Sequence, residues 1–573
     1  MSKSIFRKKT IERILSDVAS GFGDGEHSAD PHLKKELRTR DLTLMGIAAV
    51  VGAGIFSTIG EAAYQGGPGV SILFIITAIT CGFSALCYAE FASRIPVAGS
   101  AYTYAYASFG ELIAWIIGWD LLMEYAIGNI AVAISWSEYF VNLLEGFRIH
   151  LPRWTTVDFL TAYNAHKDIL QAQASHHLAD ITDRMRLDAV AWDTAPGFGA
   201  FKFIANIPAL AITAGITYLV YIGIRETRKA TNAMVILKLA VVIGVILIGF
   251  FYVTPANWHP FMPNGFKGVM KGVSGVFFAY IGFDAISTTA EECNNPQRDL
   301  PRGMIYSLII CTILYVLISF VLTGMVSFKD LQVGDPLAYV FQKVGLHNIS
   351  YVISISAVVA TASVLLIFQL GQPRIWMSMS RDGLLPKIFS KIHPKYHTPS
   401  FSTIITGLVV AVPALFLNLT IVTDLTSIGT LFAFVLVCGG VLLLPRQAHR
   451  RGRFQLPYIN AQWIVPVLFI IGVYFFRDFI KDKFTAENAH ENFPFFIFLA
   501  LSAALTVTAF IKKLSLIPVL GLLSCLYLMT EMGYTNWLRF LVWLVIGLVI
   551  YFSYSYKNSL IGKDEETQVK VNN

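Results

Sequence analysis

Charged residues are scarce in this chain. Only 14% of its 573 residues are Asp, Glu, Lys or Arg, whereas 55% are hydrophobic. A soluble domain carries about 25% charged residues, which cover its surface. Apolar runs long enough to cross a bilayer, which takes roughly 20 residues of helix, recur from Leu42 to Ser553. These features exclude a soluble fold and predict an all-α integral membrane protein.

Cysteine is equally sparse, and its positions form no metal-binding framework. The six cysteines lie in or beside apolar segments without metal-ligand spacing: Cys81, Cys87, Cys293, Cys311, Cys438 and Cys525. We expect them to be reduced packing residues. His176 and Asp180 lie one helical turn apart, but two ligands do not make a metal site, so a solvated helix face is the preferred interpretation. We therefore expect no metal and no cofactor.

The sequence also lacks the marks of an enzyme, a secreted precursor or a nucleic-acid binder. A membrane enzyme needs a nucleophile–base set or a His/Asp/Glu cluster at one depth, and neither occurs. The first 40 residues are polar and basic without a short apolar core, so no signal peptide is predicted. Ser4 to Val18 forms either a basic amphipathic helix on the inner membrane surface or a disordered tail. The net charge of +7 needs no nucleic acid to explain it.

The apolar runs predict about 14 membrane spans. The spans are approximately 42–66, 70–92, 111–145, 206–224, 230–253, 269–290, 303–327, 348–378, 400–418, 425–445, 461–478, 493–511, 515–531 and 535–555. They divide the chain into an N-terminal segment (1–41), a core of ten spans (42–445) with a long connection at 146–205, a loop (446–460), four accessory spans (461–555) and a tail (556–573).

Lys and Arg concentrate on alternate connections. The N-terminal segment holds nine, residues 374–395 hold five and residues 446–453 hold four, whereas the connections 60–69 and 418–425 hold none. The positive-inside rule then places both termini in the cytoplasm, which agrees with an even number of spans. We expect a multi-pass protein of the cell membrane with loop 446–460 cytoplasmic and connection 146–205 external.

Glycines interrupt the first and sixth spans at similar depth. The first contains Gly52-Ala53-Gly54, and the sixth contains Gly282. Interruptions at corresponding places in two halves indicate a substrate site made of backbone, and they fit two inverted repeats of five helices, about 41–253 and 269–445. Exposed N–H groups favour a carboxylate and free carbonyls favour an ammonium, so such a site suits a zwitterion. The alternative is that these small residues only allow close helix packing.

Lys238 lies about ten residues into the fifth span, too deep to reach the interface easily. An intramembrane lysine is costly unless it is paired or neutral, so it predicts a functional role, here exchange of a proton. The alternative is a permanently charged lysine that caps free carbonyls. Glu124, in the third span, is the expected partner of a Lys238 network, and Asp120 one turn before it lies nearer the inner half. Asp284, just past Gly282, is expected to cap the interrupted helix.

Several motifs together resemble one family. They are Gly52-Ala-Gly-Ile-Phe56, Leu86-Cys-Tyr-Ala-Glu-Phe-Ala-Ser93, Pro96-Val-Ala-Gly-Ser-Ala-Tyr-Thr-Tyr104, Gly110-Glu-Leu-Ile-Ala-Trp115, Phe277-Phe-Ala-Tyr-Ile-Gly-Phe-Asp284, Asn295-Pro-Gln-Arg-Asp-Leu-Pro301 and Ser380-Arg-Asp-Gly-Leu-Leu-Pro386. This set, which spans most of 41–445, resembles the amino acid–polyamine–organocation superfamily, specifically its cationic amino acid transporter subgroup and bacterial homologues.

The resemblance implies a LeuT-like 5+5 inverted repeat with helices 1 and 6 broken. It implies that the substrate carboxylate lies on the backbone of Gly52, Ala53 and Gly54. It implies that the substrate ammonium faces the carbonyls of Val50, Phe278, Ala279 and Ile281, and that Phe283 closes the site from outside. Lys238 matches a lysine that stands where sodium-coupled relatives bind Na⁺, which supports a proton as the coupling ion.

Two departures from the family pattern bear on the substrate. Ala53 replaces a hydroxyl residue of many relatives, so the carboxylate must rely more on backbone N–H groups. Phe368 stands where arginine-transporting members have a small residue, and Gln369 beside it is a further candidate. We therefore predict a secondary active transporter of small or medium neutral L-amino acids in the lipid bilayer. The alternatives are a proton-independent facilitator or exchanger that includes cationic amino acids, and a non-transporting amino acid sensor.

Overall fold

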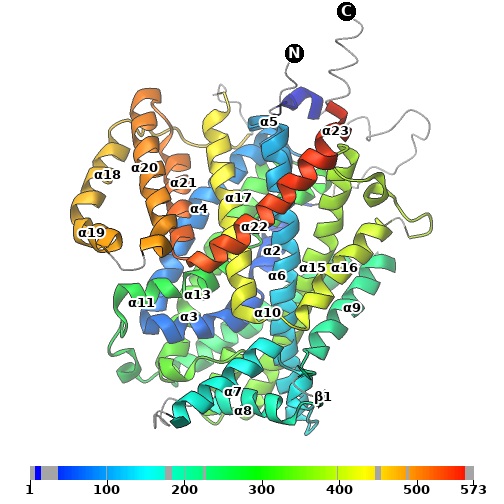
Figure 1. The fold of residues 1–573 in the computed structure, drawn as a ribbon, viewed down its shortest axis with the longest axis vertical. Helices are drawn as coiled ribbons and strands as arrows, with labels where there is room; N and C mark the ends of the chain where they lie inside the picture. The colour runs from blue at the N-terminus through cyan, green and yellow to red at the C-terminus, as the bar shows by residue number, and fades with distance from the viewer. Residues whose placement is uncertain are drawn as a thin grey trace, which may run out of the picture.

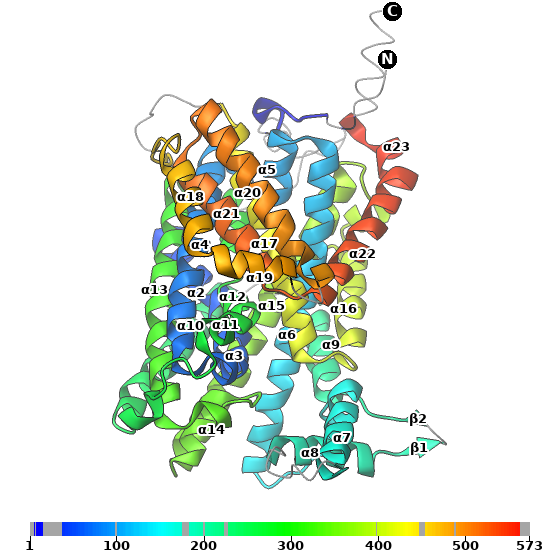
Figure 2. The same ribbon diagram turned by 60° about the vertical axis from the view of Figure 1, so that its left-hand side comes forward.

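Long helices run between the two ends of the molecule in both views (Figure 1; Figure 2). This computed structural model describes residues 5, 7–14, 37–97, 100–174, 183–198, 201–222, 227–396, 398–445, 453–485 and 489–561. The first described residues and helix α23 (Tyr556–Asn558) lie at one end of the bundle, and helices α7 (Phe159–Ala174) and α8 (Asp183–Thr194) lie at the other (Figure 2).

The helices fall into three groups by length. The longest are α4 (Val70–Arg94), α6 (Glu111–Gly146), α10 (Thr227–Phe250), α13 (Pro296–Met325), α15 (His347–Arg381), α17 (Leu419–Leu443), α20 (Phe493–Lys512) and α22 (Tyr534–Ile550). Those of intermediate length are α2 (Thr39–Val50), α9 (Ile207–Ile222), α16 (Ser400–Ala414), α18 (Ile464–Phe475) and α21 (Leu516–Thr530). The short helices are α3 (Ile59–Gly66), α5 (Ser100–Ser108), α11 (Gly265–Lys271), α12 (Val273–Phe278), α14 (Pro336–Lys343) and α19 (Arg477–Thr485).

Short π-helical and 3₁₀ segments join these helices. One π-helical turn, η1 (Gly54–Thr58), leads into α3, and another, η10 (Tyr551–Ser555), extends α22. The 3₁₀ segments are η2 (Gly67–Gly69), η3 (Arg153–Thr155), η5 (Pro255–Trp258), η6 (Phe283–Glu292), η7 (Phe328–Asp330), η8 (Lys387–Ser390) and η9 (Ala489–Asn492). One small hairpin pairs β1 (Gly197–Phe198) with β2 (Phe201–Lys202).

Several helices have the length and composition of membrane spans. Within the described residues, seven helical stretches qualify, and an eighth is obtained if Gly265–Lys271 and Val273–Ser287, which are bent by 46°, form one span. Five further apolar helices have 10–17 residues: Ile207–Ile222, Met234–Phe250, Ser400–Ala414, Ile464–Phe475 and Leu516–Thr530. The architecture is that of a helical multi-pass membrane protein, while the count of about 14 spans and the two inverted repeats stay predictions.

Helix α6 lies at the centre of the bundle. It packs against α15 and α17, and 89% of its most apolar 18-residue stretch is buried. The corresponding value is 22% for both α20 and α22, which therefore lie at the periphery. Peripheral α22 is nevertheless fastened to α6, because the rings of Trp119 and Trp543 stack 4.5 Å apart. Each indole also donates to the other residue's carbonyl, at 2.9 Å and 3.3 Å.

The connection predicted at 146–205 forms a small unit with its own core. Val157, Ala162, Ala191 and Ile204 are buried together, and partly buried Trp154, Trp192 and Ala195 pack around them. Arg153 forms an ion pair with Asp188 at 2.6 Å. The two residues considered as metal ligands, His176 and Asp180, lie outside the described residues.

Candidate functional site

Two α-helices end at the middle of the bundle. After a short break, the first is followed by a π-helical segment and the second by a 3₁₀ segment. Helix α2 ends at Val50, and the chain resumes as η1 at Gly54. Helix α12 ends at Phe278, and the chain resumes as η6 at Phe283. Gly282, which lies between the end of α12 and the start of η6, has φ 115°, a conformation that glycine adopts without a steric penalty.

The two segments touch through backbone atoms. A Cβ on Gly54 would lie 2.2 Å from Ala279 Cα, and a Cβ on Gly282 would lie 2.9 Å from Ala49 Cβ. Real Cβ atoms essentially never show contacts under 3.0 Å, so neither position has room for a side chain. The glycines predicted from the sequence are therefore required where the two segments cross.

The Tyr315 hydroxyl connects the ends of the two helices. Tyr315 lies on α13, and its hydroxyl oxygen is 2.9 Å from the carbonyl oxygen of Val50 and 2.9 Å from that of Ala279. A hydroxyl has one proton to donate, so it satisfies only one of the two carbonyls at a time. Sequence reasoning missed Tyr315, because a single tyrosine within an apolar run gives no signal of a partner 265 residues away.

Lys238 is completely buried on α10 and reaches the end of α2. Its Nζ donates to the carbonyl oxygens of Ala48, at 2.7 Å, and Val51, at 2.9 Å. An ammonium head has three donors and no acceptor, so two free carbonyls at a helix end are suitable partners. These contacts are those expected of a lysine that caps free carbonyls.

Glu124 occupies a different part of the interior. It is buried on α6, and it interacts electrostatically with Asp284 and Asp120. In the part of the chain that the structure describes, Glu124 Oε2, Asp284 Oδ1 and both carboxylate oxygens of Asp120 have no hydrogen-bond partner. The described hydrogen bonds of Lys238 are to backbone carbonyls, so a network between Lys238 and Glu124 stays a prediction.

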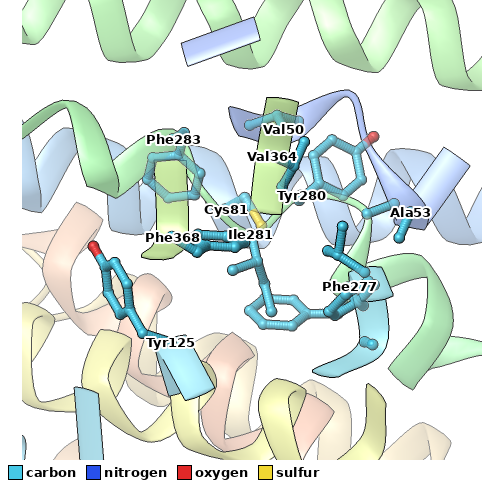
Figure 3. Close-up of a cluster of buried hydrophobic side chains, with 14 of the residues drawn as sticks. Val50, Ala53, Cys81, Tyr125, Phe277, Tyr280, Ile281, Phe283, Val364 and Phe368 are labelled. Atoms are coloured by element: carbon cyan, nitrogen blue, oxygen red, sulfur yellow. The ribbon is translucent and has the colours of Figure 1, made fainter. Parts of the chain in front are cut away.

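Apolar side chains from several elements surround the crossing point. Ile281, Phe283, Val364 and Phe368 are drawn together in Figure 3, and all four are buried. The ring of Phe368 meets Tyr125 edge to face at 5.4 Å. The predicted residues Val50, Gly52, Ala53, Gly54, Phe278 and Ala279 are also buried. The site is closed to solvent in this conformation.

Gln369 points away from this group. It is buried, and its Nε2 donates to the Thr217 hydroxyl of α9 at 2.8 Å. Val364, which sequence reasoning passed over, lies against Gly52, where an added Cβ would be 2.8 Å from Val364 Cγ2. A small residue opposite Val364 thus brings α15 onto the α2–η1 connection.

Comparison with known proteins decides the family. The amino acid permease family model matches residues 37–505, and a model for the C-terminus of these permeases matches residues 514–559. The chain belongs to the amino acid permease family. The resemblance to the amino acid–polyamine–organocation superfamily is thereby confirmed.

Relatives match the chain over nearly its whole length. It is 39% identical over 566 residues to the branched-chain amino acid permease BcaP of Bacillus subtilis (strain 168), covering 98% of this chain and 100% of the relative. It is 36% identical to a methylthioribose transporter of the same organism, with 98% and 100% covered. It is 34% identical to the chloroplastic cationic amino acid transporter 9 of Arabidopsis thaliana, with 96% and 92% covered. These are transporters, so the prediction that the chain is not an enzyme is confirmed.

Proposed function

We propose that this permease is a sodium-independent, proton-coupled symporter for small or medium neutral L-amino acids. The observation that carries the proposal is the position of Lys238, whose Nζ holds the carbonyls of Ala48 and Val51 beside the interruption of α2. The resemblance puts this lysine where sodium-coupled relatives bind Na⁺. A protein cation there replaces the sodium ion and supplies a group that exchanges a proton.

The crossing of the two interrupted segments supports a LeuT-like arrangement of two inverted repeats with 14 spans. In such transporters, discontinuous helices supply backbone groups to a mid-membrane site. The crossing of Gly54 over Ala279 and of Gly282 over Ala49 brings both interruptions to one place. By the positive-inside rule, the end with the first described residues and α23 faces the cytoplasm of the cell.

The backbone at the crossing suits a zwitterion. The carbonyls of Val50 and Ala279 share one hydroxyl proton from Tyr315, so one of them stays unsatisfied. A substrate ammonium carries three protons and satisfies both, with Phe278 and Ile281 as neighbouring carbonyls. The carboxylate then lies at the start of η1, against Gly52, Ala53 and Gly54, where helical N–H groups favour an anion.

Proton coupling follows from the charge of Lys238. The neutral amine still has two donors for the two carbonyls of α2, but hydrogen bonds from an ionised donor are roughly twice as strong as neutral ones, so loss of the proton weakens its hold on them. Glu124 is a second proposed proton-coupling residue. It interacts electrostatically with Asp284 and Asp120.

Side-chain selectivity follows from the apolar wall. Ile281, Phe283 and Phe368 are buried beside the proposed site and present only hydrocarbon and aromatic rings. A guanidinium or second ammonium placed there loses its hydration without a described ionic partner on these three residues. Neutral side chains are therefore favoured, in agreement with the substrate class named for the relative BcaP.

Reconstituted transport tests the proposal. Purified protein in liposomes is offered a panel of labelled amino acids, with methylthioribose included because one relative is named for it. We expect alanine-sized and branched neutral substrates to accumulate when an inward proton gradient is imposed, without sodium. Uptake that ignores the gradient indicates a facilitator or exchanger, and binding without uptake indicates a sensor.

Three variants separate coupling from structure. Lys238→Arg keeps a cation but cannot release a proton, so it should bind substrate and exchange it without gradient-driven accumulation. Lys238→Ala should lose accumulation and stability together, because two buried carbonyls lose their donor. Lys267→Ala, at an exposed lysine of α11, is the matched control and should behave as the wild type. Full accumulation by Lys238→Arg contradicts the coupling role.

A further inference from the structure

Glu111, the first residue of α6, is held by both ends of the chain. Its side chain is 1% exposed. The hydroxyls of Tyr551 and Ser559 donate to its carboxylate at 3.0 Å and 2.6 Å, and Tyr106 donates at 3.3 Å. Arg7, from the start of the chain, forms an ion pair with the same carboxylate at 3.8 Å. A buried carboxylate needs such donors, because its desolvation is costly.

The N-terminal segment at Arg7 lies between α6 and the C-terminal turn (Tyr551 to Leu560). The Glu111 backbone N–H donates to the Arg7 carbonyl at 2.8 Å. On the other side, the Arg7 guanidinium lies 5.2 Å from the ring centre of Tyr556, a cation–π contact. If either chain end is released, the buried Glu111 carboxylate, which the other end also contacts, is therefore exposed.

The same two chain ends also hold the end of α15. Lys9 Nζ forms an ion pair with Asp382 at 2.7 Å, just after the last residue of that helix. The Asp382 carbonyl accepts from the Leu560 N–H at 3.2 Å. The Leu384 carbonyl accepts from the Ser555 hydroxyl at 2.6 Å. Each chain end thus contacts both α6 and α15.

These two helices carry residues of the proposed site, Glu124 on α6 and Phe368 on α15, and they pack against each other. The contacts at Glu111 and Asp382 share no residue with that site. They lie at the end of the bundle that carries α23, which is the cytoplasmic end in the proposed orientation (Figure 2). Because α6 and α15 pack against each other, we expect opening of the site at this end to separate their ends.

We propose that the C-terminal turn, residues Tyr551 to Leu560, and the N-terminal residues Arg7 and Lys9 form one terminal latch, which must release before the substrate site opens at this end. The C-terminal turn is then part of the gate rather than an accessory anchor. This inference rests on the proposed transport function, since only a transporter needs its site to open on this side. It adds a control point that the substrate does not touch.

Alkylation of an introduced cysteine measures latch opening without requiring transport. Ser287 is fully buried on η6, and its hydroxyl donates to Ser100 of α5, a helix that packs against α6, at 3.0 Å. In Ser287→Cys, a small maleimide reports exposure of this position, and the six native cysteines are all buried. In this background, Ser559→Ala and Tyr551→Phe should each raise the alkylation rate by about tenfold, because each removes a hydrogen bond to a charged group.

A matched control and a double variant decide between a latch and a local structural role. Ser553→Ala removes an exposed hydroxyl of the same turn, which donates to the Ile550 carbonyl at 3.1 Å, and it should leave the rate unchanged. Arg7→Ala combined with Ser559→Ala should raise the rate by less than the product of the single effects, since both act through Glu111. Melting temperatures identify any variant that fails to fold, and Tyr551→Phe, which loses one oxygen atom, then serves as the mildest test.

Unchanged alkylation in folded Ser559→Ala and Tyr551→Phe overturns the proposal, and so does a double variant whose effect equals the product of the singles. A protein that shows the expected alkylation but transports no amino acid overturns the proposed function while the latch stands.

Discussion

Substitution of Gly54 by alanine should disrupt the crossing of the two interrupted segments. The added Cβ would lie 2.2 Å from Ala279 Cα, which is 1.2 Å closer than the 3.4 Å at which ordinary van der Waals contact begins. The opposing atoms are backbone and a methyl group, so no flexible side chain can move aside. Overpacking of this kind costs about 1–3 kcal/mol. The segments that carry the carbonyls of Val50 and Ala279 must then shift apart, and substrate affinity should fall at least tenfold, or about 1.4 kcal/mol.

The assay compares Gly54→Ala with Gly82→Ala. Gly82 lies on α4 with no atom within 4 Å of an added Cβ, so its replacement creates no clash and gains helix propensity of about 1 kcal/mol. Binding of alanine is measured by the substrate-induced rise in melting temperature, and uptake is measured in liposomes. Gly82→Ala should melt at or above the wild-type temperature and transport normally. Wild-type affinity and stability in Gly54→Ala would refute the reasoning, because the two segments would then not cross as described.

Four further predictions follow from single contacts. Tyr315→Phe should lower the melting temperature of the ligand-free protein, since buried carbonyls lose a donor at a cost of about 1–3 kcal/mol. Saturating substrate should restore much of this loss in melting temperature. Equal losses with and without substrate would contradict the prediction. Phe368→Ser should admit arginine while alanine binding stays intact, and persistent exclusion of arginine in a competition assay would show that the pocket assignment is wrong. Gly128→Ala, whose Cβ would make ordinary contacts with Thr426 at 3.7 Å and Phe368 at 3.8 Å, should fold normally and shift the uptake ratio from branched towards smaller substrates. Gly547→Ala, whose Cβ would lie 2.4 Å from the Trp119 ring, should separate α22 from α6. The loss of aromatic stacking should cost about 0.5–1.5 kcal/mol. A lower melting temperature and a changed tryptophan spectrum would report this loss.

The sequence was informative where chemistry is local. The charge content and apolar runs predict a membrane protein, and the family match agrees. Gly54 and Gly282 were singled out from the sequence because they lack side chains, and the structure leaves too little room for a Cβ at either position. The burial of Lys238 was likewise expected from its depth within an apolar run.

Sequence reasoning was less informative about which residues contact one another inside the fold. Depth along a span does not give the direction in which a side chain points. Glu124 was expected to join a network with Lys238, but the described hydrogen bonds of the Lys238 Nζ are to the carbonyls of Ala48 and Val51, and the network stays a prediction. Tyr315 was overlooked because its role depends on two carbonyls, and backbone carbonyls have no sequence signature. The span count, domain boundaries and membrane orientation stay predictions from hydropathy and charge.

The unit formed by α7, α8 and the β1–β2 hairpin lies beyond the end of the helical bundle (Figure 2). It has a core of its own and is stabilised internally by the Arg153–Asp188 ion pair. Image alignment in electron microscopy is difficult for a 63.4 kDa chain that lies mostly within a micelle. This unit offers a folded epitope, remote from the terminal latch, to which an antibody fragment can be raised as a fiducial without restraining the moving parts.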